Sequence, residues 1–74
     1  MSMYIYRTEA GEFSIIENSG RWHTLFREEL LGSYTTPEQA AFDLSVGHVF
    51  TVPGEVDLIQ LGIPKDIGRW VKSP

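Results

Sequence analysis

Cysteine is absent from this chain of 74 residues. Its absence excludes disulfide bonds, thiolate metal sites and a cysteine nucleophile. A domain of this length has a thin core, and many such domains depend on a disulfide, a metal or a partner subunit. Here the support has to come from close packing, for which two Trp, four Phe and three Tyr supply the bulk, or from a dimer. A chain without cysteine also fits a reducing compartment, and we expect a soluble cytoplasmic protein.

Basic residues are few and scattered. Six Lys and Arg stand against ten Asp and Glu, which gives an acidic chain with a formal net charge of −4. Nucleic acids and anionic membranes are bound mainly through clustered positive charge, so we expect no membrane partner and place nucleic acid behind a protein partner. No run approaches the roughly 20 apolar residues of a membrane span. The first residues also lack the pattern of a secretory signal.

Motifs of the common enzyme classes are missing as well. The serines have no nucleophile-elbow context, and the segment GIPKDIG at residues 62–68 lacks the glycine spacing of a phosphate-binding loop. Neither His23 nor His48 belongs to an HxH or HxxxH pair. A chain this small has little room for a deep ligand pocket. We therefore expect a protein that is not an enzyme and has no cofactor, catalytic residue or metal site.

Short strand patterns make up the first half of the chain. Segments rich in β-branched and aromatic residues alternate with turn residues, which predicts an antiparallel meander. The predicted strands are Met3–Arg7, Phe13–Asn18, Trp22–Arg27 and Leu30–Tyr34. Asn18 and Gly20 are expected to take left-handed conformations in the second turn, and Glu28 and Glu29 to form the third.

A helix is predicted directly after the last strand. Thr36 is a good N-cap, Pro37 suits the first helical position, and Gln39 completes a capping box. The pattern continues to Gly47, which is placed for a left-handed C-cap. A helix therefore follows the meander.

This helix has two apolar stripes, one of Ala40, Ala41 and Leu44 and one of Phe42 and Val46. We expect the first stripe to pack on the sheet and the C-terminal segment to cover the second. The expected anchors of that segment are Phe50, Leu58, Ile59, Leu61, Ile63 and Trp70. In it, residues 48–52 alternate like an edge strand, and Pro64 is expected to open a short helical turn. The prediction is a single α+β domain, residues 1–74: an antiparallel three- to four-stranded meander with one helix packed across it (β-β-β-β-α) and an irregular C-terminal segment over the helix.

One stretch of the chain resembles a known family. Gly20, Arg21 and Trp22, followed by LGSYTTPEQAA at residues 31–41, resemble the DNA-binding domain of the ethylene-response-factor (Apetala-type) family. The matching positions in the second part are Leu31, Gly32, Ser33, Tyr34, Thr36, Glu38, Ala40 and Ala41. The resemblance implies a three-stranded antiparallel sheet with a helix packed across it. It also implies that the outer sheet face reads DNA, with Arg27 at the place of a DNA-contacting arginine.

The candidate site lies on the third predicted strand. If Trp22 faces the helix as a core residue, alternation along the strand places His23, Leu25 and Arg27 on the outer face. We predict a recognition patch of Arg21, His23, Leu25 and Arg27, and the competing interpretation is an ordinary solvated sheet face.

Three functions remain open from the sequence. The first is a small interaction module that binds a protein partner or itself. The alternative is a nucleic-acid-binding domain that uses the same outer face. The third is a small enzyme or ligand-binding domain with a site that we do not recognise.

Overall fold

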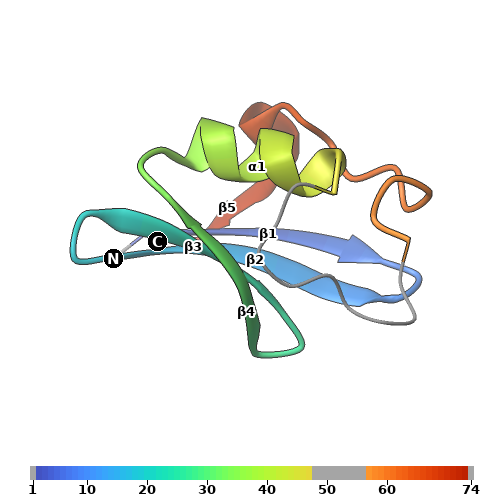
Figure 1. Ribbon diagram of the computed structural model, residues 1–74, viewed down its shortest axis with the longest axis horizontal. Coiled ribbons are helices and arrows are strands. Elements are labelled where there is room, and N and C mark those ends of the chain that lie inside the picture. Colours follow the sequence, from blue (N-terminus) through green and yellow to red (C-terminus); the bar gives the residue numbers. More distant parts are fainter. Residues whose placement is uncertain (1, 48–56, 74) are drawn as a thin grey trace.

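The structure is a computed structural model that describes residues 2–47 and 57–73. Its elements are β1 (Met3–Thr8), β2 (Gly11–Asn18), β3 (Arg21–Phe26), β4 (Glu29–Tyr34), α1 (Pro37–Ser45), the short 3-10 helix η1 (Ile67–Arg69) and β5 (Val71–Ser73). The strands form one antiparallel sheet in the order β4-β3-β2-β1-β5, and α1 lies across one face of it (Figure 1). This confirms the predicted α+β fold.

The fifth strand extends the predicted meander. β5 pairs antiparallel with β1, with Met3 opposite Ser73 and Ile5 opposite Val71. The first and last strands of the chain therefore lie side by side (Figure 1). Three residues are too few for a period-two pattern to stand out in a sequence, which explains why this strand was not predicted.

The second turn uses a different residue from the one predicted. Ser19 and Gly20 take left-handed conformations, with φ of 55° and 77°, whereas Asn18 stays in β2 and pairs with Arg21. Two left-handed residues in a two-residue loop produce the hairpin whose twist matches that of the flanking strands. The loop therefore consists of Ser19 and Gly20 alone, whereas a turn that included Asn18 would have three residues.

The third turn lies one residue earlier than predicted. It consists of Arg27 and Glu28, with φ of 51° and 69°, and joins Phe26 to Glu29, which pair across the hairpin. Glu29 is thus the first residue of β4, and Arg27 has left β3. The prediction that Arg27 belongs to the third strand is wrong, because the pairing of Phe26 with Glu29 closes the hairpin before Arg27.

Helix α1 begins at the predicted cap. The hydroxyl of Thr36 accepts a hydrogen bond from the backbone N–H of Gln39 at 3.1 Å. The side chain of Gln39 donates to Asp43 at 2.8 Å, a favourable pair one helical turn apart, and does not turn back to complete a capping box. The helix ends at Ser45, and Gly47 is left-handed with a φ of 79°, as predicted.

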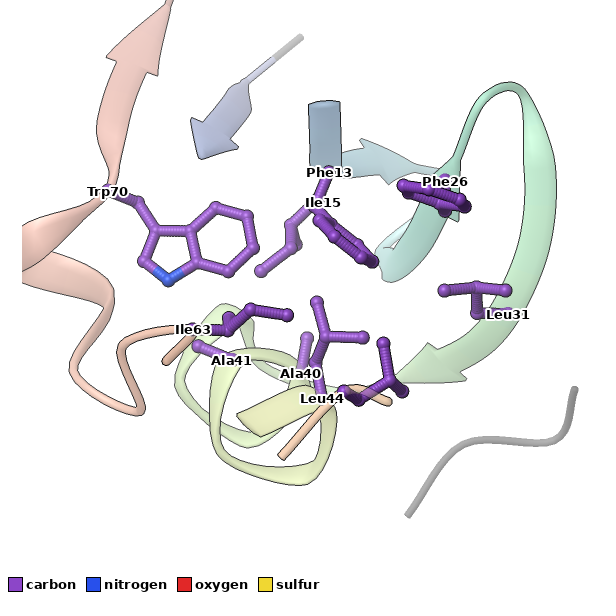
Figure 2. Packing of buried hydrophobic residues seen from close by; sticks show 10 residues of the cluster. Phe13, Ile15, Phe26, Leu31, Ala40, Ala41, Leu44, Ile63 and Trp70 are labelled. Carbon is purple, nitrogen blue, oxygen red and sulfur yellow. The ribbon is translucent and has the colours of Figure 1, made fainter. Parts of the chain in front are cut away.

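The core lies between α1 and the face of the sheet turned toward α1, which we call the inner face (Figure 2). Its buried members are Phe13, Ile15, Phe26, Leu31, Ala40, Ala41, Leu44, Leu58, Ile63 and Trp70. The predicted stripe of Ala40, Ala41 and Leu44 is fully buried, and the two small alanines let α1 approach the sheet closely. The rings of Phe13 and Phe26 stack with their centroids 4.4 Å apart.

The C-terminal segment provides part of this core. The predicted anchors Leu58, Ile63 and Trp70 are buried, and Trp70 fixes the segment by donating from its indole N–H to the carbonyl oxygen of Pro64 at 3.0 Å. Ile59 is 67% exposed, so the prediction that it is an anchor is wrong. The helical turn begins at Ile67, with Asp66 as its N-cap, rather than at Pro64. The predicted anchor Phe50 and the predicted edge strand 48–52 lie outside the described residues.

The second stripe of the helix is not buried. Phe42 is 47% exposed and Val46 is 36% exposed. The described part of the C-terminal segment packs beside α1, where Ile63 and Trp70 reach the inner face of the sheet (Figure 2). The described part of the segment therefore leaves Phe42 and Val46 partly exposed, and residues 48–56, the part of the segment next to the helix in sequence, lie outside the described residues.

Candidate functional site

The face of the sheet turned away from α1, which we call the outer face, presents two rows of side chains that run across all five strands. Side chains alternate between the two faces along each strand, and residues paired in register lie next to one another. The first row, from β4 to β5, is Leu30, Leu25, Ser14, Ile5 and Val71. The second row is Ser33, His23, Ile16, Met3 and Ser73. None of these residues belongs to the buried core.

The first row is mostly apolar, half-buried in its middle and exposed at its two ends. Four of its five side chains are large and apolar, and Leu30 and Val71 at its two ends are 53% and 68% exposed. Both α1 and η1 lie on the inner side of the sheet, so neither covers this row (Figure 1). We refer to Leu30, Leu25, Ser14, Ile5 and Val71 as the apolar row.

Two open hollows lie on either side of the centre of the sheet, one on the outer face and one at the β1–β5 edge, where residues of the outer face meet Tyr6 and Arg69. One has a volume of about 420 Å³ and lies between β1 and β5, and the other has about 330 Å³ and lies between β2 and β4. The first is lined by Ile5, Tyr6, Arg7, Arg69 and Val71. The second is lined by Ile16, Asn18, His23, Leu25 and Leu30. Each hollow therefore contains the end of the apolar row on its own side of the sheet.

Three of the four predicted site residues come together on this face. His23 and Leu25 are half-buried neighbours in the hollow between β2 and β4. Arg21 lies beyond them on β3, where its Nε donates to the hydroxyl of Ser33 at 2.8 Å and its Nη2 to the carbonyl oxygen of Ser33 at 3.3 Å. These bonds fix the guanidinium group at the edge of the face.

Arg27 does not belong to the predicted patch. Its Nη2 donates to the carbonyl oxygen of Ala10 at 2.6 Å, and its guanidinium carbon lies 5.0 Å from the ring centroid of Phe26, a core residue on the inner face. The left-handed backbone of the turn redirects this side chain away from His23 and Leu25. The placement of Arg27 on the outer face was therefore wrong.

Sequence reasoning missed five apolar residues of the outer face, namely Met3, Ile5, Ile16, Leu30 and Val71. In β1 the residues on both faces are apolar, since Tyr4 and Tyr6 pack against the core while Met3 and Ile5 point outward. Alternation then gives no polar side that would mark the solvent-facing positions. Apolar residues at both odd and even positions of β1 were themselves the signal that both faces of the sheet carry apolar side chains.

The two tryptophans are core residues rather than binding platforms on the outer face. Trp22 packs against the core from the inner face, with its ring centroid 5.8 Å from that of Tyr4. Trp70 is only 5% exposed, and its ring centroid lies 5.7 Å from that of Tyr6. The predicted core role of Trp22 is confirmed, and Trp70, for which both roles were open, has the same role.

Charged groups surround the apolar row. Arg7 on β1 forms an ion pair with Glu12 on β2, with Nε and Oε2 3.1 Å apart, and Arg69 lines the same hollow as Arg7. Away from this face, burial raises the pKa of Tyr34, and the carboxylate of Asp43 raises it further. The chemistry of the outer face is thus that of apolar contact with guanidinium groups at its margins.

Groups suited to metal binding or catalysis are not gathered in the part of the chain that the structure describes. Residues 2–47 and 57–73 contain no group of three or more His, Asp or Glu side chains that could hold a metal ion. In the same ranges every buried side-chain nitrogen or oxygen has a hydrogen-bond partner. Within these ranges no helix has the length and apolar character needed to cross a membrane.

Comparisons with protein-family models, with curated proteins and with solved structures give no match to this chain. The resemblance to the ethylene-response-factor domain therefore stays a prediction that rests on residues 20–41.

Proposed function

We propose that this protein is a non-enzymatic interaction module that binds a protein partner, or a second copy of itself, through the outer face of its sheet. The observation that carries the proposal is the apolar row, which crosses all five strands and ends in two well-exposed side chains, Leu30 and Val71. An antiparallel sheet with one face in water usually has polar residues on that face. Contiguous exposed apolar residues with a polar rim are typical of protein-binding surfaces.

Nucleic acid is the alternative occupant of the same face. Three guanidinium groups, those of Arg7, Arg21 and Arg69, lie at its margins and favour this alternative. The affinity of such a domain would come from phosphate contacts and would fall steeply with added salt. Retention of the protein on heparin at low salt, with loss of retention in Arg21→Gln, would support this alternative over a protein partner.

Site-specific photo-crosslinking tests the proposed function directly. A photoreactive phenylalanine analogue replaces Leu30 on the outer face, and a matched variant carries it at Phe42, which has a similar exposure of 47% but lies on the helix. We expect discrete protein adducts from position 30 in cells of the source organism, and none from position 42. Absence of adducts at position 30, or the same adducts from both positions, would overturn the proposal.

A further inference from the structure

We propose that the occupant of the outer face is a second copy of this chain, in a symmetric dimer whose two-fold axis runs parallel to β2 between the two sheets. This inference rests on the proposed function and specifies its partner. A two-fold interface must be self-complementary, because each pair of contacting residues occurs twice. The outer face meets that requirement in its apolar rows, its hollows and its charges.

The order of side-chain sizes along the apolar row is nearly the same from either edge of the sheet. Its order is large, large, small, large, large, with Ser14 on β2 at the centre. An axis through Ser14 places Leu30 opposite Val71 of the second copy and Leu25 opposite Ile5. Large apolar side chains therefore face large apolar side chains on both sides of the centre, and at the centre the small Ser14 faces Ser14 of the second copy.

The second row follows the same symmetry. Ile16 on β2 lies at its centre, and serines occupy both ends, at Ser33 on β4 and Ser73 on β5. The axis that passes through Ser14 also passes through Ile16, since both belong to β2. Ile16 then contacts Ile16 of the second copy, and His23 lies opposite Met3. Both rows are therefore self-complementary about the same axis, so the symmetry does not depend on one row alone.

Shape agrees with this pairing. Leu30 is more than half exposed, and the tip of the β3–β4 hairpin extends away from α1 on the outer side of the sheet (Figure 1). The two-fold axis brings Leu30 over the hollow of about 420 Å³ whose lining includes Ile5 and Val71. A leucine that projects from one copy thus enters a hollow of the other, and the same contact is repeated on the opposite side of the axis.

The charges near the ends of the apolar row are also complementary in this pairing of the two copies. The two residues before Leu30 are Glu28 in the β3–β4 turn and Glu29 at the start of β4, whereas Arg69 and Arg7, the latter already paired with Glu12, line the hollow that would receive Leu30. In the described ranges no ion pair or side-chain hydrogen bond involves Glu28 or Arg69. The two-fold axis places the acidic turn of each copy next to these arginines of the other. Such complementary charges fix the register of an interface and favour one partner over others.

The area of the outer face limits the affinity of the dimer. The strands lie about 4.8 Å apart with about 3.3 Å per residue, so β1 to β4, with six to eight residues each, and β5, with three, form a face of at most about 20 by 20 Å. Two such faces have a combined area of about 800 Å², which lies below the about 1,200 Å² of a standard interface and in the range of weak, transient ones. We therefore expect a reversible dimer that forms in the micromolar range rather than a permanent one.

Sedimentation equilibrium of the full chain tests the inference. We expect the wild type to dimerise at micromolar concentrations, Leu30→Ser to weaken dimerisation by about tenfold or more, and Phe42→Ser, a matched change on the helix, to leave it unchanged. Circular dichroism confirms that each variant keeps its fold. A wild type that stays monomeric at high micromolar concentration would overturn the inference, as would a dimer that Leu30→Ser does not weaken.

A charge exchange tests the axis itself. Glu28→Lys and Arg69→Glu should each weaken the dimer, and the double variant should recover most of the loss, because it restores an opposite pair across the axis. Absence of recovery would overturn this arrangement of the two copies.

The failure of this inference and that of the proposed function are distinguishable. A monomeric wild type whose position 30 crosslinks to a different protein would overturn the second copy as occupant and leave the interaction surface standing. A monomer without any adduct at position 30 would overturn both.

Discussion

The ring of Tyr34 lies directly over Gly32, so that a methyl group at position 32 would come within 2.9 Å of the Tyr34 hydroxyl oxygen and 3.0 Å of its Cε2 atom. We expect Gly32→Ala to lower the free energy of unfolding by about 1–3 kcal/mol, because the ring, which packs against the core, would have to move. Urea denaturation measures this loss. In a Tyr34→Ala background the same substitution should cost much less, since the ring is gone. An equal cost in both backgrounds would show that the close contact is not the reason for glycine.

Arg27 joins the first and third turns through its 2.6 Å hydrogen bond to the carbonyl oxygen of Ala10. We expect Arg27→Gln to lower the free energy of unfolding by about 0.5–1.5 kcal/mol, the usual net contribution of one hydrogen bond. Arg7→Gln is the control, because the Arg7–Glu12 ion pair has side chains that are 83% and 47% exposed. Its loss should stay below about 0.5 kcal/mol, as is typical of surface pairs. Equal losses in the two variants would contradict a special role for Arg27.

The left-handed backbone of Glu28, with a φ of 69°, predicts that glycine is favourable at this position. Left-handed geometry costs a residue with a side chain about 1 kcal/mol. We therefore expect Glu28→Gly to raise the free energy of unfolding by about 0.5–1 kcal/mol at low protein concentration, where the chain is monomeric. Glu29→Gly, one residue later and inside β4, should lower it. A loss of stability in Glu28→Gly would mean that the turn changes its conformation.

The fold was largely predictable because its signals are local. The capping of α1 by Thr36 depends on residues within one turn of the helix, and the burial of Leu44 follows from the helical period. β5 and the exposure of Phe42 were not predictable in this way. Both depend on where the C-terminal segment docks, and this is decided by tertiary contacts such as those of Ile63 and Trp70 with the core.

The candidate site was predictable only in part. Strand alternation placed Arg21, His23 and Leu25 correctly on one face, since it requires only that β3 be extended. Arg27 was misplaced because a two-residue turn with left-handed Arg27 and Glu28 has none of the usual Asn or Gly residues that would mark it. The apolar row itself depends on the register between five strands, which a single sequence does not specify.

Leu44 provides the direct test of the helix–sheet contact. It is fully buried on the stripe of α1 that faces the sheet, whereas Phe42 is 47% exposed on the other stripe. We expect Leu44→Ala to lower the free energy of unfolding by about 2–5 kcal/mol, because it leaves a cavity in a thin core. Phe42→Ala should cost less than about 1 kcal/mol despite removing more atoms, since about half of the residue already contacts water. Thermal or urea unfolding measures both, and a larger loss for Phe42→Ala would show that the two stripes are assigned the wrong way round.

The raised pKa of Tyr34 predicts a loss of stability at alkaline pH. Burial of the phenol raises its pKa above the usual 10.0, and the nearby carboxylate of Asp43 raises it further, because both disfavour the negatively charged form in the folded chain. The unfolded chain then releases this proton at a lower pH than the folded chain. The resulting contribution to stability is fully present below pH 10 and is lost as the pH rises through the folded-state pKa. We expect Tyr34→Phe, which has no phenolic proton, to lose less stability than the wild type between neutral pH and about pH 11 in urea denaturation. Asp43→Asn should lie between the two, because it removes only the second cause. Equal alkaline losses in the wild type and Tyr34→Phe would mean that the ionisation of Tyr34 is not coupled to folding.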